Sequence, residues 1–315
     1  MLVSIIVPVY NVQEYVRRTI ECLQNQSYKE IEIVVVDDGS VDNSGKICDE
    51  CASQDHRIKV FHKQNEGVSK ARNFGLRMST GSLFTFVDSD DLVDENYVKT
   101  LVEIMCREHV GIVRPVWKKG NKVLTYNIQF DNSGEFPVDK EHLYDMRFCN
   151  SIWGLYDKRL FSDLFFKENI HLCEDTLFTF SAFMKCGKMV LTNKACYDYI
   201  DRSDSVCHQK ISEKQLTIRL AHKEMYELVG ENPFLHETIE KFEFGTLVDL
   251  HRKIVLGGTY KDCRDEFKKI RSRIISLNKK WLKKERFTTQ VMEYIFLYCP
   301  PYIASMCYKL NRLKK

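Results

Sequence analysis

Proline and glycine are scarce in this chain, which contains 6 Pro and 14 Gly among 315 residues. That scarcity excludes a collagen-like repeat, and 44% hydrophobic with 29% charged residues excludes a disordered chain. A membrane-spanning segment is not evident either. The uncharged stretch 294–308 is shorter than the roughly 20 residues of a spanning helix, and Pro300-Pro301 interrupts it. Length and composition predict one large globular domain or two smaller ones.

The N-terminus lacks the features of a secretory signal. Residues 1–8 enter a strand-like segment without a basic start or a small-residue cleavage site, so we expect the protein to stay in the cytosol. The 12 cysteines are scattered, which predicts free thiols, several of them buried, in a reducing compartment. Cys48 and Cys51 have no second pair at zinc-finger spacing, which favours plain helix positions over a metal or redox site.

The small net charge of +3 combines two regions of opposite sign. Residues 1–205 hold 25 Lys and Arg against 31 Asp and Glu, whereas residues 206–315 hold 22 against 13. Within the second region, residues 261–286 are the most basic, with 11 against 4. Such asymmetry suggests a membrane surface or a nucleic acid as partner. No known nucleic-acid module is recognisable, so we expect no nucleic-acid partner.

Strand and helix patterns alternate over the first hundred residues. Apolar or β-branched runs predict strands at 2–9, 31–36, 57–62 and 83–87. Between and after them, helices are expected from Asn11, with Glu14 in a capping box, and at 43–54, 67–78 and 94–107. This alternation predicts an α/β fold with a mainly parallel sheet, whose ligands bind beyond the carboxyl ends of the strands. Residues 110–200 are mixed, with a helix at about 174–185, and the pattern is helical from about 212 onward.

Two acidic clusters follow predicted strands. Asp37-Asp38-Gly39-Ser40 comes after the second strand, and Asp88-Ser89-Asp90-Asp91 comes after the fourth. Crowded carboxylates at a ligand-binding edge favour a hard divalent cation, with phosphate oxygens as its other ligands. The alternative is that these residues form turns and cap the helices that follow.

A third motif lies at a predicted helix start. Asn65-Glu66-Gly67-Val68-Ser69-Lys70-Ala71-Arg72-Asn73 places free N–H groups and two cations where an anion would bind. A solvated amphipathic helix is the alternative, and the motif alone favours it.

Taken together, these segments resemble the family 2 glycosyltransferases with the GT-A fold. The resemblance extends over roughly residues 2–110 and rests on four ordered motifs: Ile6-Val7-Pro8-Val9-Tyr10-Asn11, Val36-Asp37-Asp38-Gly39-Ser40, Asn65-Glu66-Gly67-Val68-Ser69-Lys70-Ala71-Arg72-Asn73 and Val87-Asp88-Ser89-Asp90-Asp91. It implies a nucleotide-sugar-binding, Rossmann-like domain and an inverting transferase.

The resemblance assigns roles position by position. It implies nucleotide-sugar contacts for Pro8, Tyr10, Asp37, Asp38, Arg72 and Asp88. Pro8 and Tyr10 are expected to line the base pocket, with an aspartate on the uracil or ribose. Asp90, the second aspartate of the D-x-D motif, is expected to hold Mg²⁺ or Mn²⁺ on the diphosphate.

Further motifs downstream extend the resemblance. Cys173-Glu174-Asp175 resembles the family's E-D motif, which implies that Asp175 is the catalytic base and places Glu174 on the acceptor side; alternatively, both only favour a helix dipole. The stretch 197–205 resembles a mobile loop, with Arg202 as the phosphate clamp and His208 as a weaker metal candidate. Trp153 lies in a segment that resembles an acceptor-side motif but lacks its lysine, so a sugar contact and a core position are both open.

These inferences define one leading hypothesis. Residues 1–210 are predicted to form the catalytic domain, and residues 211–315 a helical, basic region that docks on a membrane surface or packs on the catalytic domain. The expected activity is metal-dependent transfer from a UDP-sugar to a lipid-linked or oligosaccharide acceptor in cell-surface polysaccharide assembly, at the inner face of the plasma membrane. Two alternatives remain: a nucleotidyltransferase or phosphohydrolase with the same acidic edge, and a non-catalytic nucleotide-sugar-binding module.

Overall fold

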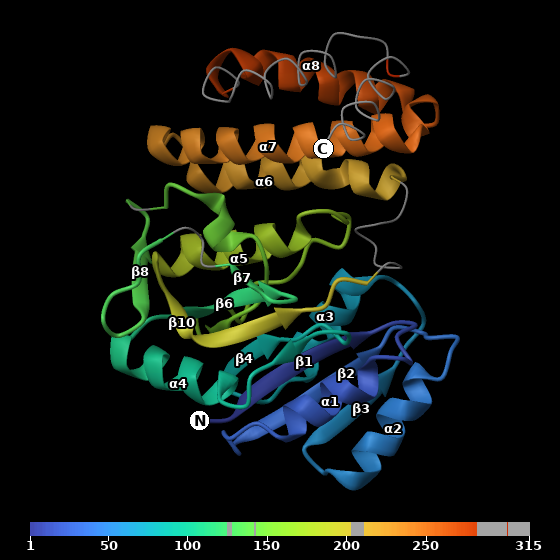
Figure 1. Ribbon diagram of the computed structural model, residues 1–315, viewed down its shortest axis with the longest axis vertical. Helices are drawn as coiled ribbons and strands as arrows, with labels where there is room; N and C mark the ends of the chain where they lie inside the picture. Colours follow the sequence, from blue (N-terminus) through green and yellow to red (C-terminus); the bar gives the residue numbers. More distant parts are fainter. Residues whose placement is uncertain (125–127, 142, 203–210, 282–300, 302–315) are drawn as a thin grey trace. The chain divides into compact units, whose positions relative to one another are not determined.

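The chain forms two compact units in the computed structural model, which describes residues 1–124, 128–141, 143–202, 211–281 and 301 (Figure 1). The first unit comprises Met1–Leu143, Arg147–Asn169 and Cys173–Arg202. The second comprises Tyr144–Met146, Ile170–Leu172 and Ser203–Lys315. The predicted candidates His208 and 294–308 lie outside the described residues, apart from residue 301.

One ten-stranded sheet forms the centre of the first unit. Its order is β3-β2-β1-β4-β9-β6-β10-β5, with β7 added to β6 and β8 added to β10. The strands are β1 (Val3–Val9), β2 (Ile31–Asp37), β3 (Ile58–His62), β4 (Leu83–Phe86), β5 (Leu92–Val93), β6 (Ile112–Lys119), β7 (Lys122–Leu124), β8 (Glu135–Asp139), β9 (Leu155–Asp157) and β10 (Lys188–Tyr199).

The direction of the strands changes across the sheet. The neighbours β3, β2, β1 and β4 are parallel, as the alternation of strands and helices predicts. Beyond β4, the short strand β9 is antiparallel to both β4 and β6, and β10 is parallel to β6 but antiparallel to β5 and β8. The predicted α/β architecture is therefore confirmed. Beyond its parallel part, the sheet continues from β4 through the antiparallel strand β9 to β6 and β10.

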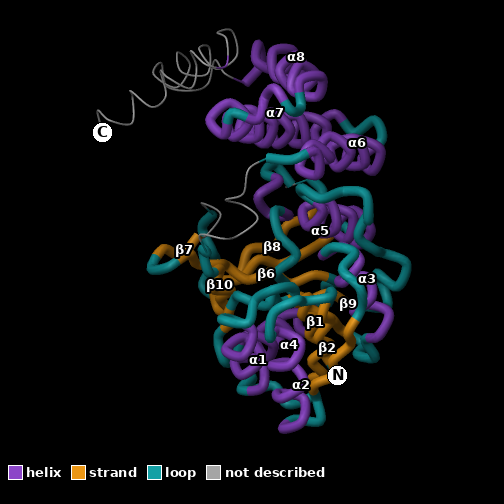
Figure 2. Tube along the Cα trace, turned by 90° about the vertical axis from the view of Figure 1, so that its right-hand side faces the viewer, coloured by secondary structure: helices purple, strands orange, loops and turns teal. Residues whose placement is uncertain are grey.

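Helices cover both faces of this sheet (Figure 2). They are α1 (Val16–Gln24), α2 (Ser44–Gln54), α3 (Val68–Met78), α4 (Tyr97–Glu108) and α5 (Glu174–Cys186). Apolar side chains of α1, α2 and α4 form one core with the odd-numbered residues of β1. On the other face, α3 packs on β1 so closely that a Cβ at Gly75 would lie 2.4 Å from the Cγ2 of Ile6. The missing side chain at Gly75 thus permits the approach of α3, which carries Arg72 to the sheet edge.

The first helix begins later than the sequence predicts. Asn11 has φ of 51°, and α1 starts only at Val16 without a side-chain cap, so the predicted capping box is wrong. The side chain of Asn11 instead accepts a hydrogen bond from the N–H of Val41 at 2.9 Å, and its own N–H donates to Ser40 Oγ at 3.1 Å. These contacts tie the end of β1 to the loop after β2, which explains why Asn11 does not cap the helix.

Cysteine usage agrees with the expectation of free thiols. All nine cysteines among the described residues are free. Cys48 and Cys51 are buried on α2, where they contribute to the core. Their predicted positions on a helix are confirmed.

In the described part of the second unit, three α-helices follow one another. They are α6 (Ile218–Val229), α7 (Pro233–Gly257) and α8 (Arg264–Trp281). Asn232 caps α7 by accepting from the N–H of Leu235, with Pro233 at the first turn, and Gly258 ends it in the left-handed conformation. Among the residues with described positions, no helix is both long and apolar enough to cross a membrane.

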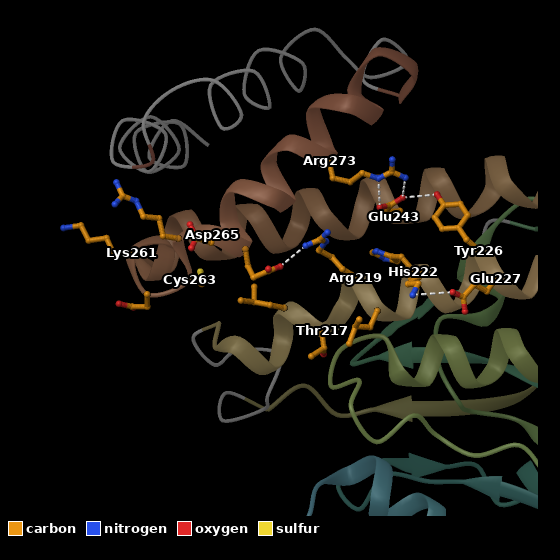
Figure 3. Close-up of a pocket in the computed structure, with 16 residues that line it drawn as sticks. Thr217, Arg219, His222, Tyr226, Glu227, Glu243, Lys261, Cys263, Asp265 and Arg273 are labelled. Atoms are coloured by element: carbon orange, nitrogen blue, oxygen red, sulfur yellow. Dashed lines mark hydrogen bonds and ion pairs between the residues drawn. The ribbon is translucent and has the colours of Figure 1, made fainter.

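An open cavity of about 1060 Å³ lies among these helices (Figure 3). Its charged lining is largely paired internally. The buried Glu243 accepts two hydrogen bonds from Arg273, at 2.8 and 2.6 Å, and one from the Tyr226 hydroxyl at 2.9 Å. These hydrogen bonds connect α6, α7 and α8 within the second unit.

Candidate active site

Both acidic clusters lie at one edge of the sheet. Asp37 ends β2, and Asp88 follows β4 by two residues; β1 separates the two strands and is parallel to both. The carboxyl ends of parallel neighbours meet at the same edge, which is where α/β folds bind ligands. The predicted juxtaposition of the two clusters is thus explained by the strand order.

Arg72 connects three of the predicted segments. It lies on α3 and is only 6% exposed. Its Nη2 is 2.9 Å from Asp88 Oδ1, its Nη1 is 3.2 Å from Glu174 Oε1, and its guanidinium lies over the ring of Phe166. Burial lowers the pKa of Arg72, but Asp88 and Glu174 outweigh burial and the net pKa is raised. One buried cation therefore joins residues 88–91, here called the D-x-D segment, to the start of α5.

Asp175 lies next to this ion network at the first turn of α5. Burial raises the pKa of its carboxyl to about 7, with a further contribution from the charge of Glu174, while Arg72 lowers it. Oδ1 of Asp175 accepts a hydrogen bond from the N–H of Thr176 at 2.7 Å. A carboxyl group with a pKa near neutral pH is suited to accept a proton from a substrate hydroxyl.

The D-x-D segment carries crowded negative charge. Arg202 Nε lies 2.6 Å from Asp90 Oδ2, and the Arg202 guanidinium also lies over the ring of Tyr15. Burial, followed by the charge of Asp88, raises the pKa of Asp90. The next residue, Asp91, is 1% exposed, and burial with the charges of Asp88 and Asp90 raises its pKa to about 8. Cations are therefore needed to balance this segment, and Arg202 supplies one of them.

A divalent cation suits the oxygen donors of Asp88 and Asp90. Among the described residues, no group of three or more His, Cys, Asp or Glu is arranged to hold a metal ion. These two aspartates could thus supply only part of a coordination sphere. Mg²⁺ is often held in that way, by one or two carboxylates together with phosphate oxygens of a substrate. The donor set fits Mg²⁺ or Mn²⁺ that arrives with a diphosphate.

Asp37 and Asp38 are buried and hydrogen-bonded to the protein itself. Asp37 contacts His62 Nδ1 at 2.8 Å through Oδ2 and accepts from the Ser40 N–H through Oδ1. Asp38 pairs with Lys63 Nζ at 2.5 Å and accepts from the N–H of Gly67 at 2.7 Å. In this structure the Asp37 carboxylate joins the loop after β2 to β3, and the Asp38 carboxylate shapes the loop that leads into α3.

Three further residues with predicted ligand contacts, Pro8, Tyr10 and Trp153, differ in their surroundings. Pro8 is buried in β1, whereas Tyr10, just beyond the strand, is 47% exposed and thus accessible to a ligand. Trp153 stacks on Tyr197 with 4.3 Å between ring centroids and lies 5.4 Å from Trp117. Trp153 is partly buried against the core. Of the two roles that the sequence left open, the structure shows the core position.

Sequence reasoning gave no individual role to two residues that contact the D-x-D segment. The Thr19 hydroxyl of α1 lies 3.0 Å from the carbonyl oxygens of both Ser89 and Asp91. The Tyr197 hydroxyl of β10 accepts from the N–H of Asp88 at 3.0 Å. Both side chains are buried in the structure, and no local sequence signal indicates their contacts with residues 70 to 109 positions away.

Comparison with known proteins shows which family the chain belongs to. The model of the family described as "Glycosyl transferase family 2" matches residues 4–180. This chain belongs to that family. GlyA, a glycosyltransferase of Streptococcus pneumoniae, is 37% identical over 65% of this chain and 31% of its own length. GgaA, a minor teichoic acid biosynthesis protein of Bacillus subtilis, is 32% identical over 82% of this chain and 60% of its own length.

Solved structures show a similar fold. TarS 1–349 of S. aureus in complex with UDP-GlcNAc has a TM-score of 0.67 and 19% identity, and the match covers 99% of this chain and 92% of that one. This member of family 2 thus has the GT-A-type architecture expected from its motifs, with a helical region toward its C-terminus. The match spans 31% of the length of GlyA and 60% of the length of GgaA.

Proposed function

We propose that this family 2 glycosyltransferase transfers a sugar, with inversion, from a UDP-sugar to a lipid-linked or oligosaccharide acceptor in cell-surface polysaccharide assembly. One observation carries the proposal: Arg72 bridges Asp88 and Glu174 beside Asp175, whose pKa is about 7. A donor-binding segment and a base of suitable pKa therefore share one buried cation. The names and complexes of GgaA and TarS support the polymer class and the UDP-sugar donor.

Asp175 acts as the general base in this proposal. Its carboxylate takes the proton of an acceptor hydroxyl as that oxygen attacks the anomeric carbon from the face opposite UDP. Attack from that face inverts the anomeric configuration. Burial raises the pKa of Asp175, whereas Arg72 keeps it near neutral, so that the base is available at cytosolic pH.

The leaving diphosphate is balanced by cations from two sources. Arg202 lies beside Asp90, and its guanidinium can form two parallel hydrogen bonds with a phosphate. Mg²⁺ or Mn²⁺ held by Asp90, with Asp88 beside it, would neutralise the charge that grows on the diphosphate as the sugar leaves. Asp88 is additionally held in place by Arg72.

A panel of nucleotide sugars tests the proposal. With purified protein and Mn²⁺, we expect UDP to be released from at least one UDP-sugar, and both EDTA and Asp90→Ala to reduce that release by at least tenfold. Release of pyrophosphate or inorganic phosphate instead would favour a nucleotidyltransferase or phosphohydrolase. Binding of UDP-sugar without any turnover, in the presence of acceptor extracts, would favour a non-catalytic module.

We also propose that the basic C-terminal region docks on an anionic membrane surface that carries the acceptor. On α8, Lys268 and Lys269 are 67% and 58% exposed. The expected attraction is electrostatic and falls with salt. The full chain should therefore co-sediment with phosphatidylglycerol vesicles at low salt, but not with phosphatidylcholine vesicles. Equal sedimentation with both kinds of vesicle would refute this part.

A further inference from the structure

We propose that Asp91 and Tyr197 are positioning residues that lock the D-x-D segment to the end of β10, so that Asp88, Asp90 and Arg202 are held in a fixed mutual arrangement. This inference rests on the proposed function, because it concerns the groups that would bind the donor diphosphate. Neither residue is expected to touch the donor itself.

Asp91 differs from the other aspartates of its segment in exposure. The side chains of Asp88 and Asp90 are 29% and 19% exposed, whereas Asp91 is 1% exposed. Oδ1 of Asp91 accepts a hydrogen bond from the N–H of Ile200 at 2.8 Å. Asp91 therefore points its acceptor at the backbone of the segment that leads to Arg202, two residues further on.

Tyr197 adds a second link between the same two segments. Its fully buried hydroxyl accepts a hydrogen bond from the N–H of Asp88 at 3.0 Å. The D-x-D segment is thus joined to β10 by Tyr197 at Asp88, and to the residues that follow β10 by Asp91 at Ile200. Together the two hydrogen bonds fix the backbone at both places where the proposed diphosphate ligands are attached.

The surrounding contacts indicate that these links can be removed without unfolding the site. Val93 of β5 pairs with Tyr197 of β10 through the backbone, and Asp94 Oδ2 accepts from the Cys196 N–H at 2.6 Å. The Thr19 hydroxyl additionally contacts the carbonyl oxygens of Ser89 and Asp91 within the D-x-D segment. Loss of one hydroxyl should therefore loosen the arrangement locally and leave the sheet intact.

Amide hydrogen exchange of the unliganded full chain tests the lock directly. In Tyr197→Phe, we expect exchange in peptides that contain Asp88 to be about tenfold faster, the factor for loss of one buried hydrogen bond. Tyr97→Phe is a matched control, because Tyr97 is equally buried, lies 6.4 Å from Tyr197 between ring centroids and makes no described hydrogen bond to residues 88–91. Equal exchange in Tyr197→Phe, Tyr97→Phe and the wild type would overturn the proposal.

A pair of Asp91 variants separates positioning from direct binding. Asp91→Asn keeps an acceptor for the Ile200 N–H, whereas Asp91→Leu removes it. By calorimetric titration with UDP and Mn²⁺, we expect Asp91→Asn to bind within threefold of the wild type and Asp91→Leu to bind at least tenfold more weakly. Equal losses in both variants would mean that the charge itself is needed, which contradicts a positioning role. If wild-type protein bound no UDP, the proposed function would fail, while the exchange experiment would still decide whether the lock exists.

Discussion

The near-neutral pKa of Asp175 leads to the sharpest prediction about activity. A general base works only when it is deprotonated, so the rate of transfer should rise with pH and level off above about pH 7. Below that pH, each unit should reduce the rate about tenfold. The slope follows from a single protonation.

Glu174→Gln perturbs this pKa in a known direction. The charge of Glu174 contributes to the raised pKa of Asp175, so its removal should lower that pKa. At pH 6, the deprotonated fraction, roughly 10% for a pKa of about 7, would then increase, and the rate would increase relative to its plateau. The readout is the midpoint of the pH profile, because Glu174 also pairs with Arg72 and the plateau itself can fall.

The assay measures the initial rate of UDP release between pH 5 and pH 9. A variant of an exposed residue serves as the control. Glu66→Gln is a suitable control, since Glu66 is a surface residue paired with Lys70. We expect its midpoint to equal that of the wild type. A midpoint that is the same in Glu174→Gln and in the wild type would refute the assignment of Asp175, as would near-normal transfer by Asp175→Asn.

Three further predictions concern charge and stability. Asp175→Asn should raise the free energy of unfolding at pH 8 by about 4 kcal/mol, because a folded-state pKa of about 7 is about three units above the unfolded value and each unit costs about 1.4 kcal/mol. Near pH 4 the gain should be small, and urea unfolding at the two pH values makes the comparison. Arg202→Leu should weaken UDP binding at least tenfold by calorimetry, whereas unchanged binding would remove Arg202 as the phosphate clamp. Arg273→Leu should destabilise the chain by about 2 kcal/mol because it leaves the Glu243 carboxylate buried and unpaired, while the exposed Lys253→Leu should change stability by less than about 0.5 kcal/mol.

The sequence predicts the first half of the sheet well, because each element there has its own local signal. Apolar β-branched runs indicate the parallel strands β1 and β2, and helical patterns separate them. The antiparallel strands β5 and β9, with two and three residues, are too short to show any periodicity. The start of α1 was misplaced because Asn11, a good cap in isolation, forms tertiary contacts with the loop after β2.

The candidate site is also predicted only in part from the sequence. Motifs indicate Arg72 and Glu174 separately, but their contact spans 102 positions of sequence and only the fold reveals it. Asp38 matches a nucleotide-binding position, yet it pairs with Lys63, which no motif contains. The pKa of Asp175 near 7 depends on burial and on neighbours from other elements, so it too follows only from the structure.

The central claim is inverting transfer from a UDP-sugar with Asp175 as the base. Its most direct test is ¹H NMR of the product formed from an α-linked UDP-sugar and an acceptor, with wild-type protein and with Asp175→Asn. We predict a β-linked product and free UDP from the wild type, and retained UDP binding with at least a hundredfold slower transfer in the variant. An α-linked product, or an equally active variant, would contradict the account.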